Sequence, residues 1–215
     1  MALLLARTHY SLLTAPASPR ALCEEAVRCG LSHLALADTN ALYGLWPFAQ
    51  ESARLGLRAV FGSELVVGGR RLVARARAPP RHPEPCAVGR ERHRRAGEQP
   101  FDLARACERH AEGLWIVCSD VRLLPELSVR LGPETLRVGL PPRTGAPSRA
   151  VDLDAPEASE PATGRKLPDP APGWPRQQLL EVARDLDLTL CAVRDVWVPR
   201  PEVRAVLQLV VAVEG

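Results

Sequence analysis

Three carboxylates come shortly after apolar runs that are typical of buried strands. These residues are Asp38, Glu64 and Asp195. In folds built from parallel strands and helices, functional groups lie just beyond the carboxyl ends of the strands. Carboxylates that converge there repel one another unless a metal ion or a proton neutralises their charge. The three residues are therefore candidate metal ligands at one end of a sheet.

The same three residues have a structural alternative. Asp38 would cap the loop that follows it, Glu64 would pair with an arginine, and Asp195 would cap the last helix. Short polar side chains cap helices and turns in this way, and ion pairs satisfy buried carboxylates. Spacing alone leaves both interpretations open.

The elements that would position these carboxylates alternate between strands and helices. Apolar runs predict strands at 3–6, 34–37, 58–61, 114–118, 135–140 and 189–193, with a hairpin formed by 65–67 and 70–76. Apolar spacing and capping residues predict helices at 19–29, 46–55, 101–112, 175–186 and 201–213, and a helical stretch after Ser119 that Pro125 breaks or restarts. This alternation predicts an α/β fold with a mostly parallel sheet, which right-handed crossovers could close into a barrel.

The chain of 215 residues suits one domain that spans 1–215. Residues 77–100 and 141–173 are rich in proline and lack a clear period, which predicts two loops or insertions.

Composition excludes several classes of protein. The net charge of +3 is far from that of a dedicated nucleic-acid binder, and Lys166 is the only lysine among 28 basic residues. Two arginine clusters, 70–77 and 90–95, are either solvated surface or phosphate contacts. The six cysteines form no C-x-x-C pair, and no apolar run is long enough to span a membrane. We expect a cytoplasmic protein without a membrane partner.

Several motifs resemble one known family. They are Tyr10-Ser-Leu-Leu13, Leu34-Ala-Leu-Ala-Asp38, Ala41-Leu-Tyr-Gly44, Gly62-Ser-Glu64 and Leu188-Thr-Leu-Cys-Ala-Val-Arg-Asp-Val196. The chain resembles the PHP (polymerase and histidinol phosphatase) domain at the N-terminus of the bacterial DNA polymerase III alpha subunit. The resemblance implies a distorted (β/α)7 barrel, here with the two Pro-rich insertions.

The resemblance also implies a metal site, most of whose ligands are missing here. Leu5 and Arg7 stand at the family's H-x-H pair, Thr39 at a histidine after Asp38, and Trp197 at a histidine after Asp195. Glu64 keeps the family's glutamate. Asp38, Glu64 and Asp195 remain as a residual metal site that could hold a divalent ion weakly, and no cofactor is expected. Arg7 could instead neutralise Asp38 or Glu64 and replace the metal with a salt bridge.

Two functions follow from the resemblance. The first is a catalytically degenerate PHP domain with no catalytic residues of its own and a structural or interaction role in DNA replication or translesion synthesis. Its partners would be a polymerase body or other replisome or translesion proteins, with DNA contacted only indirectly. The alternative is a metal-dependent phosphoesterase or 3′–5′ exonuclease that uses the remaining carboxylates. DNA polymerase activity belongs to the family, whereas the polymerase palm is absent from this chain.

Overall fold

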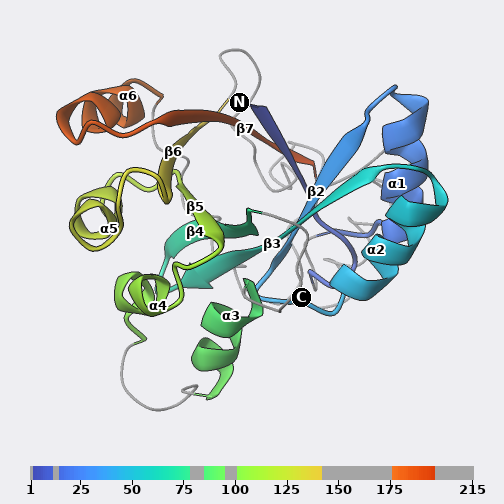
Figure 1. Cartoon of the computed structure of the whole chain (residues 1–215), viewed down its shortest axis with the longest axis horizontal. Helices are drawn as coiled ribbons and strands as arrows, with labels where there is room; N and C mark the ends of the chain where they lie inside the picture. Colours follow the sequence, from blue (N-terminus) through green and yellow to red (C-terminus); the bar gives the residue numbers. More distant parts are fainter. Residues whose placement is uncertain (1, 12–14, 78–84, 95–100, 142–175, 197–215) are drawn as a thin grey trace, which may run out of the picture.

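Seven strands form one curled, mixed sheet with helices on its outer side (Figure 1). The computed structural model describes residues 2–11, 15–77, 85–94, 101–141 and 176–196. The strands are β1 (Ala2–Ala6), β2 (His33–Thr39), β3 (Arg58–Val67), β4 (Arg70–Ala76), β5 (Leu114–Cys118), β6 (Leu136–Leu140) and β7 (Leu190–Val196). The helices are α1 (Pro19–Arg28), α2 (Leu45–Arg54), α3 (Pro85–Arg94), α4 (Leu103–Arg109), α5 (Leu124–Arg130) and α6 (Arg176–Asp185).

The strand order follows the chain from β1 to β7, and β1 also pairs with β7. The pairs β3–β4 and β4–β5 are antiparallel, and the other pairs are parallel. The hairpin turn is made by Gly68 and Gly69, whose φ angles are 55° and 74°. Two-residue hairpin turns favour positive φ at both positions, which glycine adopts without strain. The α/β class and the hairpin are therefore confirmed.

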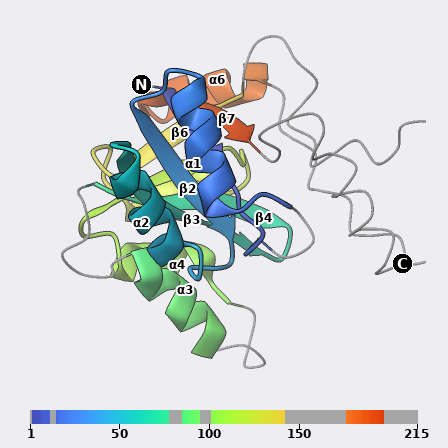
Figure 2. The ribbon, with the colours of Figure 1, turned by 90° about the vertical axis from the view of Figure 1, so that its right-hand side faces the viewer.

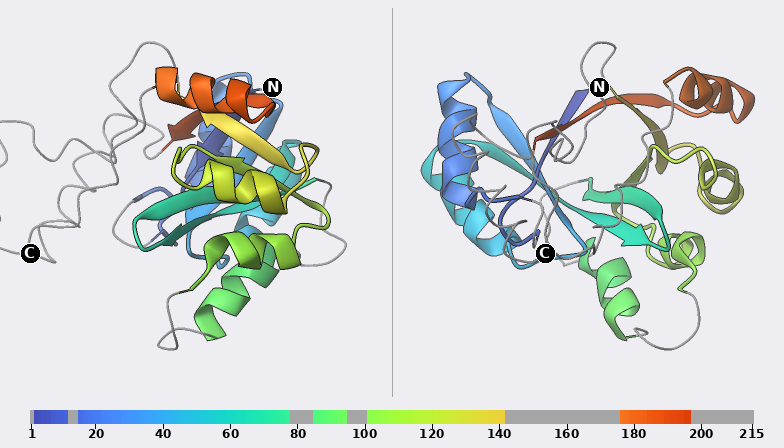
Figure 3. Two further views of the ribbon diagram at one scale, coloured as in Figure 1. Left: turned by 90° about the vertical axis from the view of Figure 1, so that its left-hand side faces the viewer. Right: turned by 180° about the vertical axis from the view of Figure 1, so that it is seen from behind.

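The two faces of the sheet bury different side chains. The concave inner face carries a small apolar cluster, made of Leu5, Ala35, Ala37, Val73, Val117 and Cys191. Alternate residues of the same strands point outward into two larger cores. One core lies beneath α1 and α2, and the other lies beneath α4, α5 and α6 (Figures 2 and 3). The described middle of the inner face is therefore apolar.

The sequence predicts one strand at 58–61 and a separate hairpin strand at 65–67. This separation is wrong, because β3 runs from Arg58 to Val67 without interruption. Ser63 continues the strand and donates a hydrogen bond from Oγ to the carbonyl oxygen of Asp38 at 3.0 Å. Gly62 fits because a Cβ at that position would lie 2.9 Å from the carbonyl oxygen of Ala74. Gly62 and Ser63 are small enough for the neighbouring backbone to approach closely, and they do not form a turn.

The segment 77–100, predicted as a loop or an insertion, contains a helix, because α3 occupies Pro85–Arg94. Val88 is fully buried, and Glu91 accepts hydrogen bonds from Arg109 and pairs with His110. Tertiary contacts with α4 therefore stabilise a helix whose own sequence has a weak apolar period.

Other expectations fall outside the described residues, namely the insertion at 141–173, apart from Pro141, and the helix at 201–213. Within the described part of the chain, no helix is long and apolar enough to cross a membrane.

Candidate functional site

The pleat of four strands, β1 to β4, brings four polar residues to one end of the inner face, which we call the mouth. Arg7 and Thr39 each lie two residues beyond an inner-face residue, Leu5 and Ala37 respectively. Side chains two residues apart on a strand point to the same face, so both enter the mouth. Glu64 is the register partner of Thr39, and Arg71 precedes the inner-face residue Val73 by two positions.

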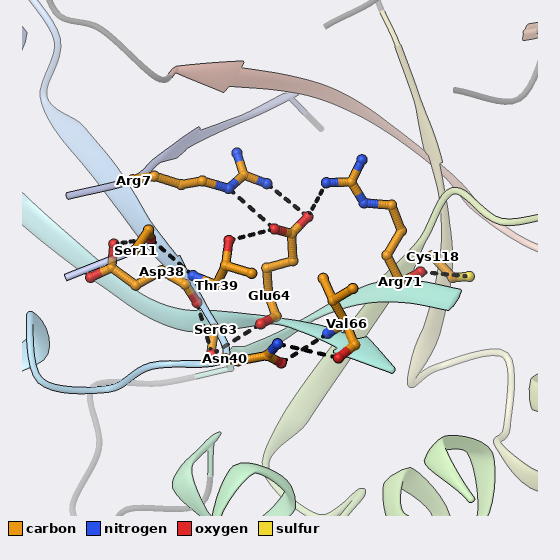
Figure 4. A network of polar contacts seen from close by, with 10 residues as sticks. All are labelled: Arg7, Ser11, Asp38, Thr39, Asn40, Ser63, Glu64, Val66, Arg71 and Cys118. Atoms are coloured by element: carbon orange, nitrogen blue, oxygen red, sulfur yellow. Dashed lines mark hydrogen bonds and ion pairs between the residues drawn. The ribbon is translucent and has the colours of Figure 1, made fainter. Parts of the chain in front are cut away.

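Glu64 is the centre of this group (Figure 4). Arg7 donates to it through Nη2 to Oε1 at 2.8 Å and through Nε to Oε2 at 3.3 Å. Arg71 donates through Nη2 to Oε1 at 2.7 Å, and Thr39 donates from Oγ1 to Oε2 at 2.8 Å. Arg7 and Glu64 are 1% and 3% exposed, so this ion pair is held away from water. Two-pronged arginine pairs of this kind are among the strongest in proteins.

Burial alone would raise the pKa of Glu64, because the charged form loses its hydration. The positive charges of Arg7 and Arg71, with the hydrogen bonds from Arg7 and Thr39, outweigh burial and hold the pKa of Glu64 below its ordinary value. Glu64 is therefore an anion at neutral pH.

This lowered pKa predicts a pH-dependent contribution to stability. A carboxyl group with a lower pKa in the folded state stabilises the fold above its unfolded pKa, about 4.3, and loses that contribution as pH falls through its folded pKa. We expect the free-energy difference between wild type and Glu64→Gln to be largest near pH 7 and to shrink below about pH 4. Urea unfolding at a series of pH values measures it. A difference that is constant from pH 7 to pH 3 would contradict the pairing.

Asp38 lies at the same end of the sheet but has its own set of donors. Its Oδ1 accepts from the backbone N–H of Thr8 at 2.6 Å and from Ser11 Oγ at 2.7 Å, and its Oδ2 accepts from Thr8 Oγ1 at 2.7 Å. Asp38, Thr8 and Ser11 are all almost fully buried. The hydrogen bonds of Asp38 therefore link the segment after β1 to the end of β2. Ser11 Oγ adds to this link, because it accepts a hydrogen bond from the N–H of Thr39 at 3.0 Å.

Gly44 packs directly against this carboxylate. A Cβ on Gly44 would lie 2.4 Å from Asp38 Oδ2 and 3.0 Å from Thr8 Oγ1, although its φ of −73° suits any residue. We expect Gly44→Ala to lower the free energy of unfolding by about 1–3 kcal/mol through overpacking.

Gly89 offers the matched control for Gly44. A Cβ there would meet its nearest neighbour, Leu42 Cδ1, at an ordinary 3.7 Å, so Gly89→Ala in α3 should be neutral or slightly stabilising. Thermal unfolding followed by circular dichroism compares the two variants. Equal stability of Gly44→Ala and wild type would show that the Asp38 cluster tolerates a displaced helix start.

The structure places the other predicted site residues as follows. Leu5 is buried in the inner-face cluster, and Asp195 is its register partner in β7, with a side chain outside the described set. Trp197 lies beyond the described residues. Sequence analysis missed the roles of Thr8, Ser11 and Arg71. The two-residue period of the hairpin, which puts Arg71 and Val73 on one face, was the signal that could have identified Arg71.

The described residues of the mouth do not fit a divalent metal centre. The carboxylates and neutral imidazoles that bind divalent metals need free lone pairs, whereas Glu64 is surrounded by two guanidinium groups and a hydroxyl. Guanidinium groups donate hydrogen bonds and cannot act as ligands at neutral pH. Across the residues that the structure describes, no three His, Cys, Asp or Glu side chains gather so that they could hold a metal ion.

The family model described as "PHP domain" matches residues 4–114, which include part of β1, all of β2 to β4 and both halves of the Arg7–Glu64 pair. The chain belongs to the PHP domain family. The match covers just over half of the chain, and residues 115–215 lie outside it.

Curated relatives of this PHP domain are DNA polymerases. The error-prone DNA polymerase of Mycobacterium tuberculosis is 42% identical over 94 residues, which are 44% of this chain and 9% of that protein. The error-prone DNA polymerase of Nocardia farcinica is 41% identical over 102 residues, which are 47% of this chain and 8% of that protein. The chain thus matches less than a tenth of the length of these relatives.

Solved structures share the fold at low identity. An amidohydrolase from Chromobacterium violaceum, solved with bound sulfate and no metal, is 14% identical, with a TM-score of 0.53 and 97% of this chain and 96% of that chain covered. A two-domain protein from Bacteroides vulgatus that contains a predicted PHP-like metal-dependent phosphoesterase is 12% identical, with a TM-score of 0.55 and 92% and 52% covered. At such identities the likeness concerns the fold alone.

Proposed function

We propose that this chain is a catalytically degenerate PHP domain with a structural role in DNA replication or translesion synthesis. Its partner would be a polymerase body or another replisome or translesion protein. The similarity to error-prone DNA polymerases supports a role in DNA replication or translesion synthesis. The matched segment is a small part of each polymerase, which supports a polymerase body as the partner. The proposed loss of catalytic activity is supported by the residues of the mouth, where two arginines and a threonine contact Glu64.

The observation that carries this proposal is the buried pair of Arg7 and Glu64. The guanidinium of Arg7 stands at a position where the resemblance implies a metal-binding histidine, and its Nη2 lies 2.8 Å from Glu64 Oε1. Thr39, at a second such position, donates to the other oxygen of the same carboxylate. A salt bridge and a hydrogen bond thereby satisfy the glutamate that a metal would otherwise neutralise.

The architecture fits this role. We infer that the whole chain forms a distorted (β/α)7 barrel of the PHP type, with insertions at 77–100 and 141–173. Pairing of β1 with β7 supports closure, and the contacts of Glu64 with the buried Arg7 and the half-buried Arg71 link β1, β3 and β4 at the mouth. The ion pairs would hold together strand ends that a metal ion would hold in an active hydrolase.

A phosphodiesterase assay tests the loss of hydrolysis. The full chain is incubated with bis(p-nitrophenyl) phosphate and with a 3′-labelled single strand, in the presence of Mn²⁺ or Zn²⁺. We expect hydrolysis no faster than in metal-containing buffer, because the described residues supply no metal-bound nucleophile. Turnover that requires metal and disappears in Glu64→Gln would instead establish the phosphoesterase or exonuclease function.

A further inference from the structure

Two large aromatic side chains stand exposed beside the mouth. Tyr43 is 76% exposed and precedes α2, and Trp46 is 73% exposed in its first turn. Tyr43 and Trp46 lie on either side of Gly44, the N-cap of α2, and are three residues apart in the chain. Large exposed aromatics so close together mark a binding surface more often than a random feature of a monomer.

The segment after β1 adds two more rings to this surface. The rings of His9 and Tyr10 are in contact, with centroids 4.4 Å apart. Tyr10 packs against the start of α2, since its Cδ2 lies 3.1 Å from the position of a Cβ on Gly44. The hydrogen bonds of Thr8 and Ser11 to Asp38 fix this segment, so the rings are held in place before any ligand binds.

The charge next to these rings is positive. α3 contacts the segment before α2, because a Cβ on Gly89 would lie 3.7 Å from Leu42 Cδ1 (Figures 1 and 2). Arg90 and Arg94 of this helix are exposed. Glu91, the carboxylate within α3, is buried and paired with Arg109 and His110.

Residues 40–47 carry no charged side chain, so nothing on that segment offsets the arginines. A ligand that spans the start of α2 and the exposed side of α3 would therefore meet both aromatic rings and guanidinium groups. Both features suit a polyanion that carries aromatic groups.

We propose that this surface, the rim patch (Tyr10, Tyr43, Trp46, Arg90 and Arg94), binds single-stranded nucleic acid. Bases stack on the aromatic rings, and the arginines contact the phosphates. The sequence predicts that this chain contacts DNA only through its partners. The rim patch would instead contact DNA directly. The rim patch uses neither Arg7 nor Glu64, so its binding is independent of the degenerate mouth.

Fluorescence anisotropy with a labelled oligothymidylate of about 15 nucleotides tests the rim patch on the full chain, since single-strand sites span about 4–16 nucleotides. With EDTA present and at low salt, we expect binding with a Kd at or below about 100 µM. Trp46→Ala and Tyr43→Ala should each weaken binding by about fivefold or more, because each removes an aromatic ring on which a base stacks. Arg90→Ala with Arg94→Ala should make the slope of log affinity against log salt shallower by about 0.7 for each phosphate that the arginines neutralise in wild type.

Two exposed residues far from the rim patch provide the controls. Val129 in α5 is 88% exposed, and Arg184 in α6 is also exposed. Val129→Ala and Arg184→Ala should bind the oligonucleotide as wild type does.

Three results would overturn the inference: no binding by wild type below about 100 µM at low salt, wild-type affinity in the aromatic variants, or equal losses in the controls. In the first case the rim patch would be a protein-docking surface instead. The phosphodiesterase assay remains a separate test, because binding in EDTA needs no metal.

Discussion

Arg7→Ala should lower the free energy of unfolding by about 3 kcal/mol, because removing one partner of a buried ion pair leaves the other charge uncompensated. Arg7 is 1% exposed and donates twice to Glu64, which is 3% exposed. The second arginine, Arg71, still neutralises part of the charge, which keeps the loss at the lower end of the range for broken buried pairs. Urea unfolding of the two proteins at pH 7 measures the loss.

Arg20→Ala is the matched control for Arg7, since water screens the exposed pair of Arg20 with Glu24 and its loss should change stability little. If Arg7→Ala does not fold, Arg7→Met combined with Glu64→Leu and Arg71→Met should recover most of the stability, because apolar residues of similar volume often replace a whole buried ionic group at little cost. A loss below about 0.5 kcal/mol in Arg7→Ala would mean that the pair does not stabilise the fold.

Asp38→Ala should lower the free energy of unfolding by about 3 kcal/mol or more, because it leaves buried donors of Thr8 and Ser11 without their acceptor. The segment after β1 should also open locally, since its link to β2 is removed. Hydrogen exchange of the Thr8 amide, which donates to Asp38 Oδ1, reports that opening directly.

Asp38→Asn and Asp185→Ala show whether the loss of stability comes from the missing acceptor oxygens of Asp38 or from removing any carboxylate. Asp38→Asn keeps one acceptor oxygen and should lose less than Asp38→Ala. Asp185 is exposed at the end of α6, and its replacement should change stability by less than about 0.5 kcal/mol. Unchanged exchange of the Thr8 amide in Asp38→Ala would contradict the anchoring role.

Local signals in the sequence predicted most of the described elements. Ser18 caps α1 by accepting from the N–H of Ala21 at 3.1 Å, and Gly30 ends that helix with a φ of 71°. Both features depend on a few neighbouring residues, so the sequence shows them. α3 could not be predicted, because its stability depends on Val88 and Glu91 contacting elements that are distant in the chain.

The sequence predicts which residues lie at the candidate site, but it does not predict which of them contact one another. Strand ends identified Asp38 and Glu64, and the resemblance identified Arg7 and Thr39. The pleat then separates Glu64, which meets Arg7 at the mouth, from Asp38, which meets Thr8 and Ser11. Which donor reaches which carboxylate depends on strand register, and register was not fixed by the apolar pattern alone.

The central claim is that the Arg7–Glu64 pair stands in place of a metal ion. Calorimetric titration of wild type and Glu64→Gln with Mn²⁺ tests it most directly, because Mn²⁺ favours oxygen and nitrogen ligands over the chain's free cysteines. We expect no binding tighter than about 100 µM (about −5.5 kcal/mol) and the same heats for both proteins. Micromolar Mn²⁺ binding by wild type that Glu64→Gln abolishes would contradict the claim and would restore the metal centre.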